Sequence, residues 1–374
     1  MSFESNSPIT ARVFQLNWLL ILLLVCVAGI GTMTLYSAGN GSFSPWAGNH
    51  MIRFFVLLAG ACAISFIDMR FWYKMTYPIY AAGLVMLIIV EVMGMVGMGA
   101  QRWIDLGIIQ LQPSELMKLA VIMALAKYFH GKSPEDIKHL STLIIPAMLV
   151  VAPVGLVMTQ PDLGTSLMIV MGAAIILFVA GAAWWLFAGG AIIVAAAIPV
   201  AYSFLHDYQK KRVDIFLDPE KDPFGAGYHI TQSKIAIGSG GLSGKGFLNG
   251  SQGHLNYLPE KQTDFIFTLF VEEWGFFGGL VLLTLNAAII LYGIWISYNC
   301  RHTFGRLLAF GLTMNYALYV SINIAMVMGL IPVVGVPLPM FSHGGTAMMA
   351  ALIGFGLIMG CSIHRDAKLP RSGF

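Results

Sequence analysis

Charged residues are scarce in this sequence. Only 10% of its 374 residues are Asp, Glu, Lys or Arg, while 57% are hydrophobic and the mean hydropathy is +0.77. A soluble domain carries about 25% charged residues, so this chain could not cover itself with a water-compatible surface. We therefore expect lipid to be its solvent. The formal net charge of +3 is too small to indicate nucleic-acid binding.

Cysteine is scarce as well. The four cysteines are far apart, and each lies in or beside an apolar run: Cys26, Cys62, Cys300 and Cys361. With no C-x-x-C pair and no Cys/His cluster, the sequence indicates neither a disulfide framework nor a zinc site. It also lacks internal repeats and low-complexity segments. The paired, Gly/Pro-broken spans of many secondary transporters are missing too, which disfavours a transporter without excluding one.

Long apolar runs take the place of these features. A hydrocarbon core of about 30 Å needs about 20 apolar residues in a helix. We expect spans at 14–36, 52–68, 75–97, 114–129, 141–159, 165–181, 184–203, 270–298, 304–329 and 342–362. The 165–203 stretch is nearly continuous, and Gly181 to Trp185 gives its only plausible turn. The first run shows no A-x-A-like cleavage site, so we interpret it as a retained helix.

The positions of the cations orient these spans, because cytoplasmic loops are enriched in Lys and Arg. With the N-terminus inside, the short outside loops hold little beyond Arg53 and Arg102. The inside segments carry Arg12, Arg70, Lys74, Lys127, Lys132, Lys138, Arg301, Arg306, Arg365, Lys368 and Arg371. We therefore predict one all-α membrane domain over residues 1–374, with about ten transmembrane helices and both termini in the cytoplasm. One large extracytoplasmic loop, residues 202–263, would join helices 7 and 8.

Ionisable residues begin two of the spans. Glu115 and Lys118 are three residues apart, which places them on one helix face at the start of the fourth span. Pro113 suits the first helical turn, and Glu115 suits the positive end of the helix dipole. The pair is either an N-terminal cap with an ion pair, or a cationic Lys118 held by Glu115 toward an anionic ligand. Asp162 begins the sixth span, and we interpret it as a cap or turn residue first and as a catalytic residue second.

The 202–263 loop gathers most of the other outside cations. They are Lys210, Lys211, Arg212, Lys221, Lys234, Lys245 and Lys261. The Gly-Ser-Gly-Gly-Leu-Ser-Gly-Lys stretch at 238–245 is not a Walker motif, because Ser239 stands five residues before Gly244 and Gly246 follows Lys245. We interpret its glycines as tight turns of a folded loop and keep the cations as candidate diphosphate partners.

Asp264 closes this loop at the point where polar loop becomes apolar helix. Either Thr263 or Asp264 could simply cap that helix. A carboxylate at a dry margin can also have its pKa raised and act as a general base. Glu272 and Glu273 follow about two turns later, and we expect one of them to face polar protein groups.

Several motifs together resemble one family. They are Gln101-Arg102-Trp103-Ile104, Gln112-Pro113-Ser114-Glu115, Gln160-Pro161-Asp162-Leu163-Gly164-Thr165, Leu217-Asp218-Pro219-Glu220, Gly225-Ala226-Gly227-Tyr228, Gln232-Ser233-Lys234 and Thr263-Asp264-Phe265-Ile266-Phe267. Over nearly the whole chain they resemble the SEDS (RodA/FtsW) family of cell-wall proteins. Segments 218–220, 238–242 and 331–339 are similar to the RodA branch, which acts in elongation. Two positions depart from the family pattern: Gln262 replaces a usual His, and His343 a usual Tyr.

The resemblance implies a peptidoglycan glycosyltransferase that polymerises lipid II during cell elongation. It implies a multi-pass protein of the bacterial inner membrane with its active site on the periplasmic side. The implied partners are a class B penicillin-binding protein, acting as transpeptidase, and the other membrane proteins of the elongation complex. The alternative functions are a lipid II flippase and a noncatalytic membrane scaffold for the penicillin-binding protein.

The family's catalytic Asp matches Asp264, which would act as general base on the acceptor hydroxyl. The donor sugar leaves from undecaprenyl diphosphate, a good leaving group once cations stabilise it, so no second carboxylic acid is required. In-line attack on an α-linked donor would give a β-linked glycan with inversion. Our candidate substrate-binding residues are Arg102, Glu115, Lys118, Asp162, Arg212 and Lys234. A divalent cation could share the diphosphate charge, but no ligand cluster in the sequence demands one.

Overall fold

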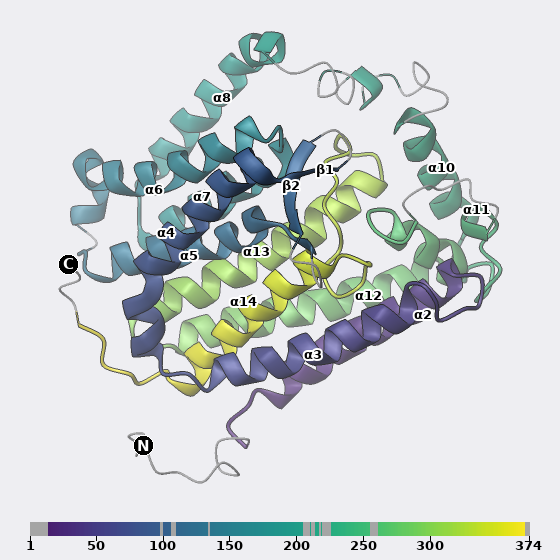
Figure 1. Ribbon diagram of the computed structural model, residues 1–374, viewed down its shortest axis with the longest axis horizontal. Coiled ribbons are helices and arrows are strands. Elements are labelled where there is room, and N and C mark those ends of the chain that lie inside the picture. Colours follow the sequence, from purple (N-terminus) through teal and green to yellow (C-terminus); the bar gives the residue numbers. More distant parts are fainter. Residues whose placement is uncertain are drawn as a thin grey trace.

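The computed structural model describes residues 14–97, 100–105, 110–133, 135–204, 210, 214–216, 218, 226–254 and 261–370. Within these residues, a long helix lies at each of the ten predicted spans (Figure 1). They are α2 (Trp18–Ala38), α3 (Ala47–Ser65), α4 (Met69–Met93), α5 (Pro113–His130), α6 (Leu140–Thr159), α7 (Leu163–Ala180), α8 (Trp184–Phe204), α12 (Ile266–Asn299), α13 (Thr303–Val327) and α14 (Gly345–Ile363). The prediction of an all-α polytopic membrane protein is confirmed.

Among the described residues, eight of these helices are long and apolar enough to cross a membrane, all but α5 and α8. Helix α5 carries Glu115, Lys118 and Lys127, and nearly all of its residues are buried. It is therefore surrounded by protein and needs no lipid-facing apolar stripe. In α8 the apolar stretch covers only Trp184–Ala197.

Helix ends follow local capping more closely than hydropathy. Helix α4 begins six residues before the predicted residue 75, because the Asp68 side chain caps it by accepting a 2.7 Å hydrogen bond from the Arg70 N–H. The turn predicted between the sixth and seventh spans is confirmed. Gly181 ends α7 with a φ of 105°, a left-handed conformation that suits glycine.

The connections are more ordered than predicted. Between α4 and α5, the strands β1 (Met95–Gly97), β2 (Ala100–Asp105) and β3 (Gln110–Leu111) form a small antiparallel sheet in the order β1-β2-β3. This small sheet lies in one connection and leaves the predicted fold class unchanged, because the spans themselves are helices. The described residues of the long loop include α10 (Ala226–Ser239) and α11 (Ser251–His254), and η1 (Asp136–Lys138) precedes α6.

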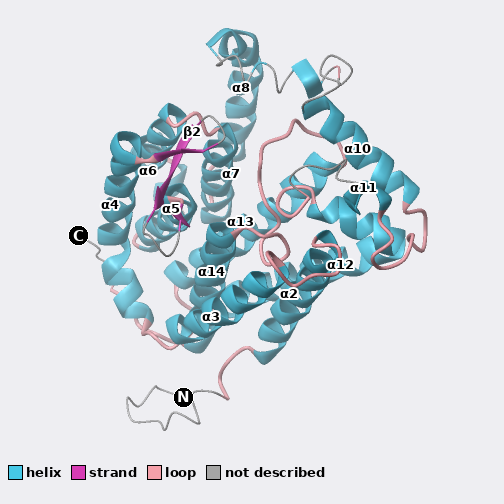
Figure 2. Cartoon of the chain, turned by 45° about the vertical axis from the view of Figure 1, so that its right-hand side comes forward, coloured by secondary structure: helices cyan, strands magenta, loops and turns pink. Residues whose placement is uncertain are grey.

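Helices α13 and α14 run through the middle of the bundle (Figures 1 and 2). Helices α2 and α3 cover one side of them, and α4, α6 and α7 lie on the other. Helix α8 projects away from the bundle, and α10 and α11 lie at the opposite side, beside α12. This arrangement leaves α5, α13 and α14 as the most enclosed helices.

The two ends of the bundle differ in chemistry. At one end the start of α2 meets the end of α14, where Asn17 Nδ2 donates to Ser362 Oγ at 3.2 Å. Arg301 and Arg365, which we predicted to lie inside, meet at this end through a 3.1 Å main-chain hydrogen bond. The opposite end holds Asp162, Asp264 and the segment 328–344, which we call the Pro/Gly segment.

Candidate active site

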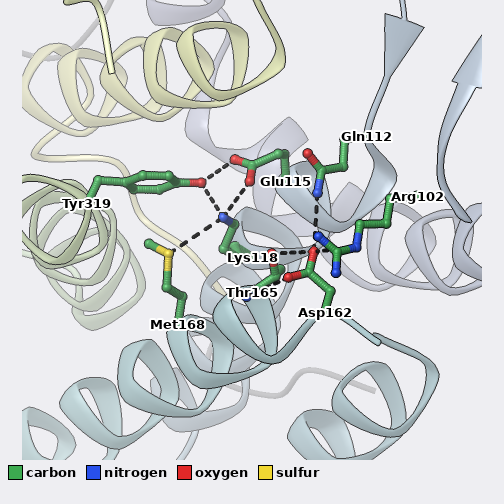
Figure 3. Close-up of polar contacts among 8 residues, drawn as sticks. All are labelled: Arg102, Gln112, Glu115, Lys118, Asp162, Thr165, Met168 and Tyr319. Carbon is green, nitrogen blue, oxygen red and sulfur yellow. Dashed lines mark hydrogen bonds and ion pairs between the residues drawn. The ribbon is translucent and has the colours of Figure 1, made fainter. Parts of the chain in front are cut away.

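A group of eight polar and sulfur-bearing side chains lies between α5, α7, α13 and β2 (Figure 3). We call it the buried cluster: Arg102, Gln112, Glu115, Lys118, Asp162, Thr165, Met168 and Tyr319. At its centre Lys118 Nζ lies 2.7 Å from Glu115 Oε1 and 3.9 Å from Met168 Sδ, and it also contacts the Tyr319 hydroxyl. That hydroxyl donates to the second Glu115 oxygen.

This centre is closed to solvent. Glu115 is 5% exposed and Lys118 is 2% exposed. An ammonium group has three donors, and in this conformation Glu115, Tyr319 and Met168 take them. The ion pair predicted between the two charged residues is confirmed. Contact of Lys118 with a diphosphate stays a prediction, and it requires this arrangement to open.

Asp162 is the N-cap of α7, which confirms the first of its two interpretations. Its carboxylate accepts from the Thr165 main-chain N–H at 3.2 Å and from the Thr165 hydroxyl at 2.9 Å. Gln112 donates to it at 3.4 Å, and Arg102 Nε lies 3.7 Å away. Arg102 also donates to the Pro161 carbonyl at 2.6 Å. Its guanidinium therefore holds the start of α7 in place, although the side chain is partly exposed.

Asp264 lies one residue before the N-cap of α12, which is Phe265. Neither Thr263 nor Asp264 therefore occupies the N-cap position. The Asp264 carbonyl accepts a 2.9 Å hydrogen bond from Asn323 Nδ2, and the same amide donates to the Val336 carbonyl at 2.7 Å. The Asp264 carboxylate is half-buried beside Gly335 in the Pro/Gly segment.

Helix α13 connects this carboxylate to the buried cluster. Tyr319, which contacts Glu115 and Lys118, and Asn323, which holds Asp264, are four residues apart and so lie on one helix face. A second connection runs through the Pro/Gly segment, where Gly164 at the start of α7 lies against Val334. The structure thus brings Asp264, Asp162 and the Glu115–Lys118 pair together at one end of the bundle.

The glycine-rich stretch packs against a break in α12. Gly275, inside α12, has a φ of 67°, and a Cβ atom there would lie 2.3 Å from the Gly244 nitrogen. The break leaves carbonyl groups of α12 without partners inside the helix, and N–H groups of the glycine-rich stretch donate to them. One example is the 3.0 Å hydrogen bond from the Lys245 N–H to the Glu272 carbonyl. These glycines therefore serve close main-chain packing, which confirms the interpretation of a folded loop.

Both glutamates after Asp264 are buried. Glu272 Oε1 lies 2.6 Å from Lys245 Nζ and 3.1 Å from the Ser251 hydroxyl, while Glu273 contacts Ser37 at the end of α2. The expectation that one of them faces polar protein groups is confirmed, and Lys245 is engaged inside the protein. Lys261 is also buried and donates to the Gly253 carbonyl at 2.8 Å; burial lowers its pKa.

Two predicted cations lie apart from the buried cluster. Lys234 is exposed on α10, and its stem lies against Gly329 at the start of the Pro/Gly segment. Arg212 lies outside the described residues. No group of three or more His, Cys, Asp or Glu side chains that could hold a metal ion occurs in the described part of the chain.

Sequence reasoning missed the polar residues of α13. Asn315, Tyr319 and Asn323 recur every four residues in an apolar span, and all three are buried. Polar groups at membrane depth are costly, so this spacing was an available signal of a polar face turned toward protein.

Comparisons with known proteins agree over most of the chain. The family model of the FtsW, RodA and SpoVE cell cycle proteins matches residues 11–367. The peptidoglycan glycosyltransferase MrdB of Escherichia coli K12 is 46% identical over 289 residues, which are 77% of each chain.

Two solved structures show a similar fold. One is a chain of a peptidoglycan synthase complex that coordinates polymerization and crosslinking. It is 31% identical with a TM-score of 0.80, over 94% of this chain and 98% of that one. The other is the rod shape determining protein RodA of Thermus thermophilus, 29% identical with a TM-score of 0.71, over 94% of this chain and 97% of that one.

Proposed function

The chain belongs to the FtsW/RodA/SpoVE (SEDS) family of cell cycle proteins and is a peptidoglycan glycosyltransferase, and we propose that it polymerises lipid II with Asp264 as its general base. The resemblance seen in the sequence is thereby confirmed at the level of family, enzyme class and multi-pass membrane protein. The position of Asp264 carries the proposal for the mechanism.

That position suits a base. The carboxylate is half-buried at the junction of loop and helix, Asn323 fixes its main chain, and the Pro/Gly segment lies against it. A half-buried carboxylate can be reached by a substrate hydroxyl while it stays partly shielded from water. Fixing the main chain on α13 holds the carboxylate in one place, which a general base requires.

The proposed step transfers one glycosyl group. The acceptor hydroxyl oxygen attacks the anomeric carbon of the donor while its proton passes to the Asp264 carboxylate. The bond from that carbon to the diphosphate oxygen breaks, and the electron pair leaves with the diphosphate. Inversion of an α-linked donor gives the β-linked product. Cations near the diphosphate stabilise its growing charge, which lowers the barrier.

The other predicted site residues support this step in different ways. Arg102 and Lys234 are the described candidates for diphosphate contact, because Arg102 is partly exposed and Lys234 is exposed. Glu115 and Lys118 support the face of α13 that holds Asp264, and Asp162 fixes the start of α7. Arg212 stays a predicted diphosphate partner. A divalent cation bound with the substrate would share the diphosphate charge, although the described residues include no His/Cys/Asp/Glu cluster to hold one.

We also propose a location and a partner. The two chemically different ends of the bundle suit an enzyme of the bacterial inner membrane whose Asp264 end faces the periplasm. A similar solved chain belongs to a peptidoglycan synthase complex that couples polymerization to crosslinking. We infer that this chain likewise acts with a class B penicillin-binding protein in the elongation machinery.

The deciding experiment uses purified protein with its partner, lipid II in detergent and a gel assay for glycan strands. We expect strands from the wild type and none from Asp264→Asn, which keeps the shape of the side chain but lacks its basicity. Circular dichroism and the thermal midpoint, Tm, check that the variant folds. Full polymerisation by a folded Asp264→Asn protein would exclude Asp264 as the base.

The alternative functions predict a different result. A lipid II flippase or a noncatalytic scaffold would give no glycan strands from either protein. Glu91→Gln is a matched control, because Glu91 lies at the end of α4, outside the proposed site. It removes one carboxylate without touching the proposed base, so we expect wild-type polymerisation from it.

A further inference from the structure

A short stretch of the Pro/Gly segment lies against the proposed base. We call it the 334–336 strip, and it consists of Val334, Gly335 and Val336. Gly335 has a φ of 72°, and a Cβ atom there would lie 3.5 Å from Asp264 Oδ2. A positive φ suits glycine, so the strip brings main chain, and not a side chain, up to the carboxylate. The strip is therefore one wall beside the group that we propose to take the proton.

Helix α13 holds this wall, but not evenly. Asn323 Nδ2 donates to the Asp264 carbonyl at 2.9 Å and to the Val336 carbonyl at 2.7 Å, so one amide joins the base to the strip. At the other end of the strip, the Val334 N–H donates to the sulfur of Met326 at 3.4 Å. A thioether sulfur is a weak acceptor, so α13 holds Val334 less firmly than Val336.

Helix α7 lies against the weakly held end. Gly164 is the second residue of α7, and a Cβ atom there would lie 3.0 Å from both the carbonyl oxygen and the Cγ1 atom of Val334. These distances are tighter than ordinary contact, so a side chain would fit only if the strip moved by a few tenths of an ångström. Glycine costs about 1 kcal/mol against alanine inside a helix, and the close approach of the strip gives it a packing reason here.

The first turn of α7 is itself held in place. Asp162 caps it by accepting from the main-chain N–H and the hydroxyl of Thr165, and Arg102 lies beside the same carboxylate (Figure 3). Arg102 also donates to the Pro161 carbonyl at 2.6 Å. Because Gly164 belongs to this fixed turn, the strip has a firm surface behind its loosely bonded end.

We propose that Gly164 is a positioning residue for the reaction, because its missing side chain sets how the 334–336 strip lies beside the Asp264 carboxylate. This assignment rests on the proposed function, since it takes Asp264 as the base. A base must lie about 2.6–3.2 Å from the oxygen whose proton it takes, and a misplacement of about 1 Å can cost on the order of 100-fold in rate. A smaller shift of the wall beside the base should have a smaller but measurable cost.

The test adds one methyl group at two positions of the same helix. Gly164→Ala places the methyl group against the strip. Gly172→Ala, also buried and about two turns later, places it where no described atom outside its own helical turn lies within 4 Å. With purified protein, its partner and lipid II, we expect Gly164→Ala to lower kcat about tenfold with KM unchanged. Gly172→Ala should keep the wild-type kcat. Wild-type kcat in Gly164→Ala, or an equal loss in both variants, would overturn the inference.

A rescue variant separates positioning from a simple loss of folded protein. Val334→Ala removes the Cγ1 atom that the added methyl group would meet, so Gly164→Ala/Val334→Ala should recover part of the lost kcat. Recovery should be incomplete, because the contact with the Val334 carbonyl oxygen remains. Val334→Ala alone is the reference for the double variant. A double variant no better than the product of the two single losses would show that the methyl group does not act through the strip.

Hydrogen exchange gives a second readout, which does not depend on turnover. A strip displaced from Asn323 and Met326 has less protected main-chain N–H groups. We therefore expect mass spectrometry to show several-fold faster exchange in residues 331–339 of Gly164→Ala, and wild-type exchange there in Gly172→Ala. Equal exchange in the two variants would exclude a positioning role even if kcat fell.

The two readouts keep this inference separate from the proposed function. Absence of polymer from the wild type, or full polymerisation by Asp264→Asn, would count against the proposed function. Hydrogen exchange would then still decide whether Gly164 sets the position of the strip.

Discussion

The buried cluster and the start of α14 lie at the same end of the bundle, but their charges are arranged in opposite ways. In the buried cluster, Lys118 faces Glu115 at 2.7 Å, and Asp162 caps α7 beside Arg102. At the start of α14, Arg53 stands beside an uncapped helix end and no carboxylate is bonded to it in the described chain.

The difference separates two roles that polar residues take in a membrane protein. Groups that balance one another are stable without a ligand, so they hold helices in position. A cation that has no carboxylate beside it and is exposed to water, as Arg53 is, is solvated without a ligand and is available to an anion. The first region should therefore control folding, and the second should contribute little to it.

The largest expected effect is loss of the buried ion pair. Lys118→Met leaves the Glu115 carboxylate buried without its cation, and we expect the free energy of unfolding to fall by about 3–5 kcal/mol. Titration with SDS in mixed micelles, followed by tryptophan fluorescence, measures this loss. The double variant Glu115→Gln/Lys118→Met is the control. It leaves no buried charge, so it should recover most of the stability. A single variant as stable as the wild type would contradict a closed cluster.

The next effect is loss of the α7 cap. Asp162→Ala removes the acceptor of the Thr165 N–H, and we expect a loss of about 1–2 kcal/mol in the same SDS titration. Asp162→Asn keeps a carbonyl acceptor and should lose less than Asp162→Ala. Equal losses in both variants would show that charge toward Arg102, and not capping, is what Asp162 supplies.

These two regions also differ in how visible they are in the sequence. Glu115, Lys118 and Asp162 could be predicted because each is an ionisable residue at the start of an apolar span, where capping and i,i+3 pairing depend on near neighbours in the sequence. The ten helices could be located from their apolar runs because a run is likewise a property of neighbouring residues in the sequence.

Features that depend on tertiary packing could not be predicted. The start of α14 was placed at residue 342, so its glycines were not recognised as a helix end. Arg53 was interpreted only as an outside cation, because its neighbour Gly345 is nearly 300 positions later in the chain. Tyr319 was missed because its partners lie on α5.

A third prediction supplies the start of α14 with its own carboxylate. Gly344→Asp places an acceptor at the N-cap and a negative charge beside Arg53. We expect about 1 kcal/mol of added stability, because both the capping and the dipole interactions are favourable. SDS titration measures this gain.

Gly344→Ala is the control for this variant. It adds the same Cβ atom, which would lie 3.3 Å from the Pro337 side chain, without adding a carboxylate. We expect Gly344→Ala to gain no stability. An equal gain in both variants would mean that contact with Pro337, and not the carboxylate, is responsible.

The smallest expected effect is a pH dependence of stability. Burial, and to a lesser extent the charge of Arg53, lowers the pKa of His343 from its usual value of 6.5. Between the lowered pKa and 6.5 the unfolded chain binds more protons than the folded one, so stability falls as the pH falls below 6.5. Without ligand, the wild type should lose more stability than His343→Gln between pH 8 and pH 5.5, measured by SDS titration.

The comparison with His343→Gln isolates one imidazole. His50 and Arg53, which face His343 from α3, are unchanged in His343→Gln, and so is His302 at the other end of the bundle, whose pKa burial lowers to about 4. The difference between the two proteins therefore reports on His343. Equal pH dependence in both would show that His343 keeps its usual pKa in the folded chain, so that neither its burial nor Arg53 disfavours the imidazolium at the start of α14.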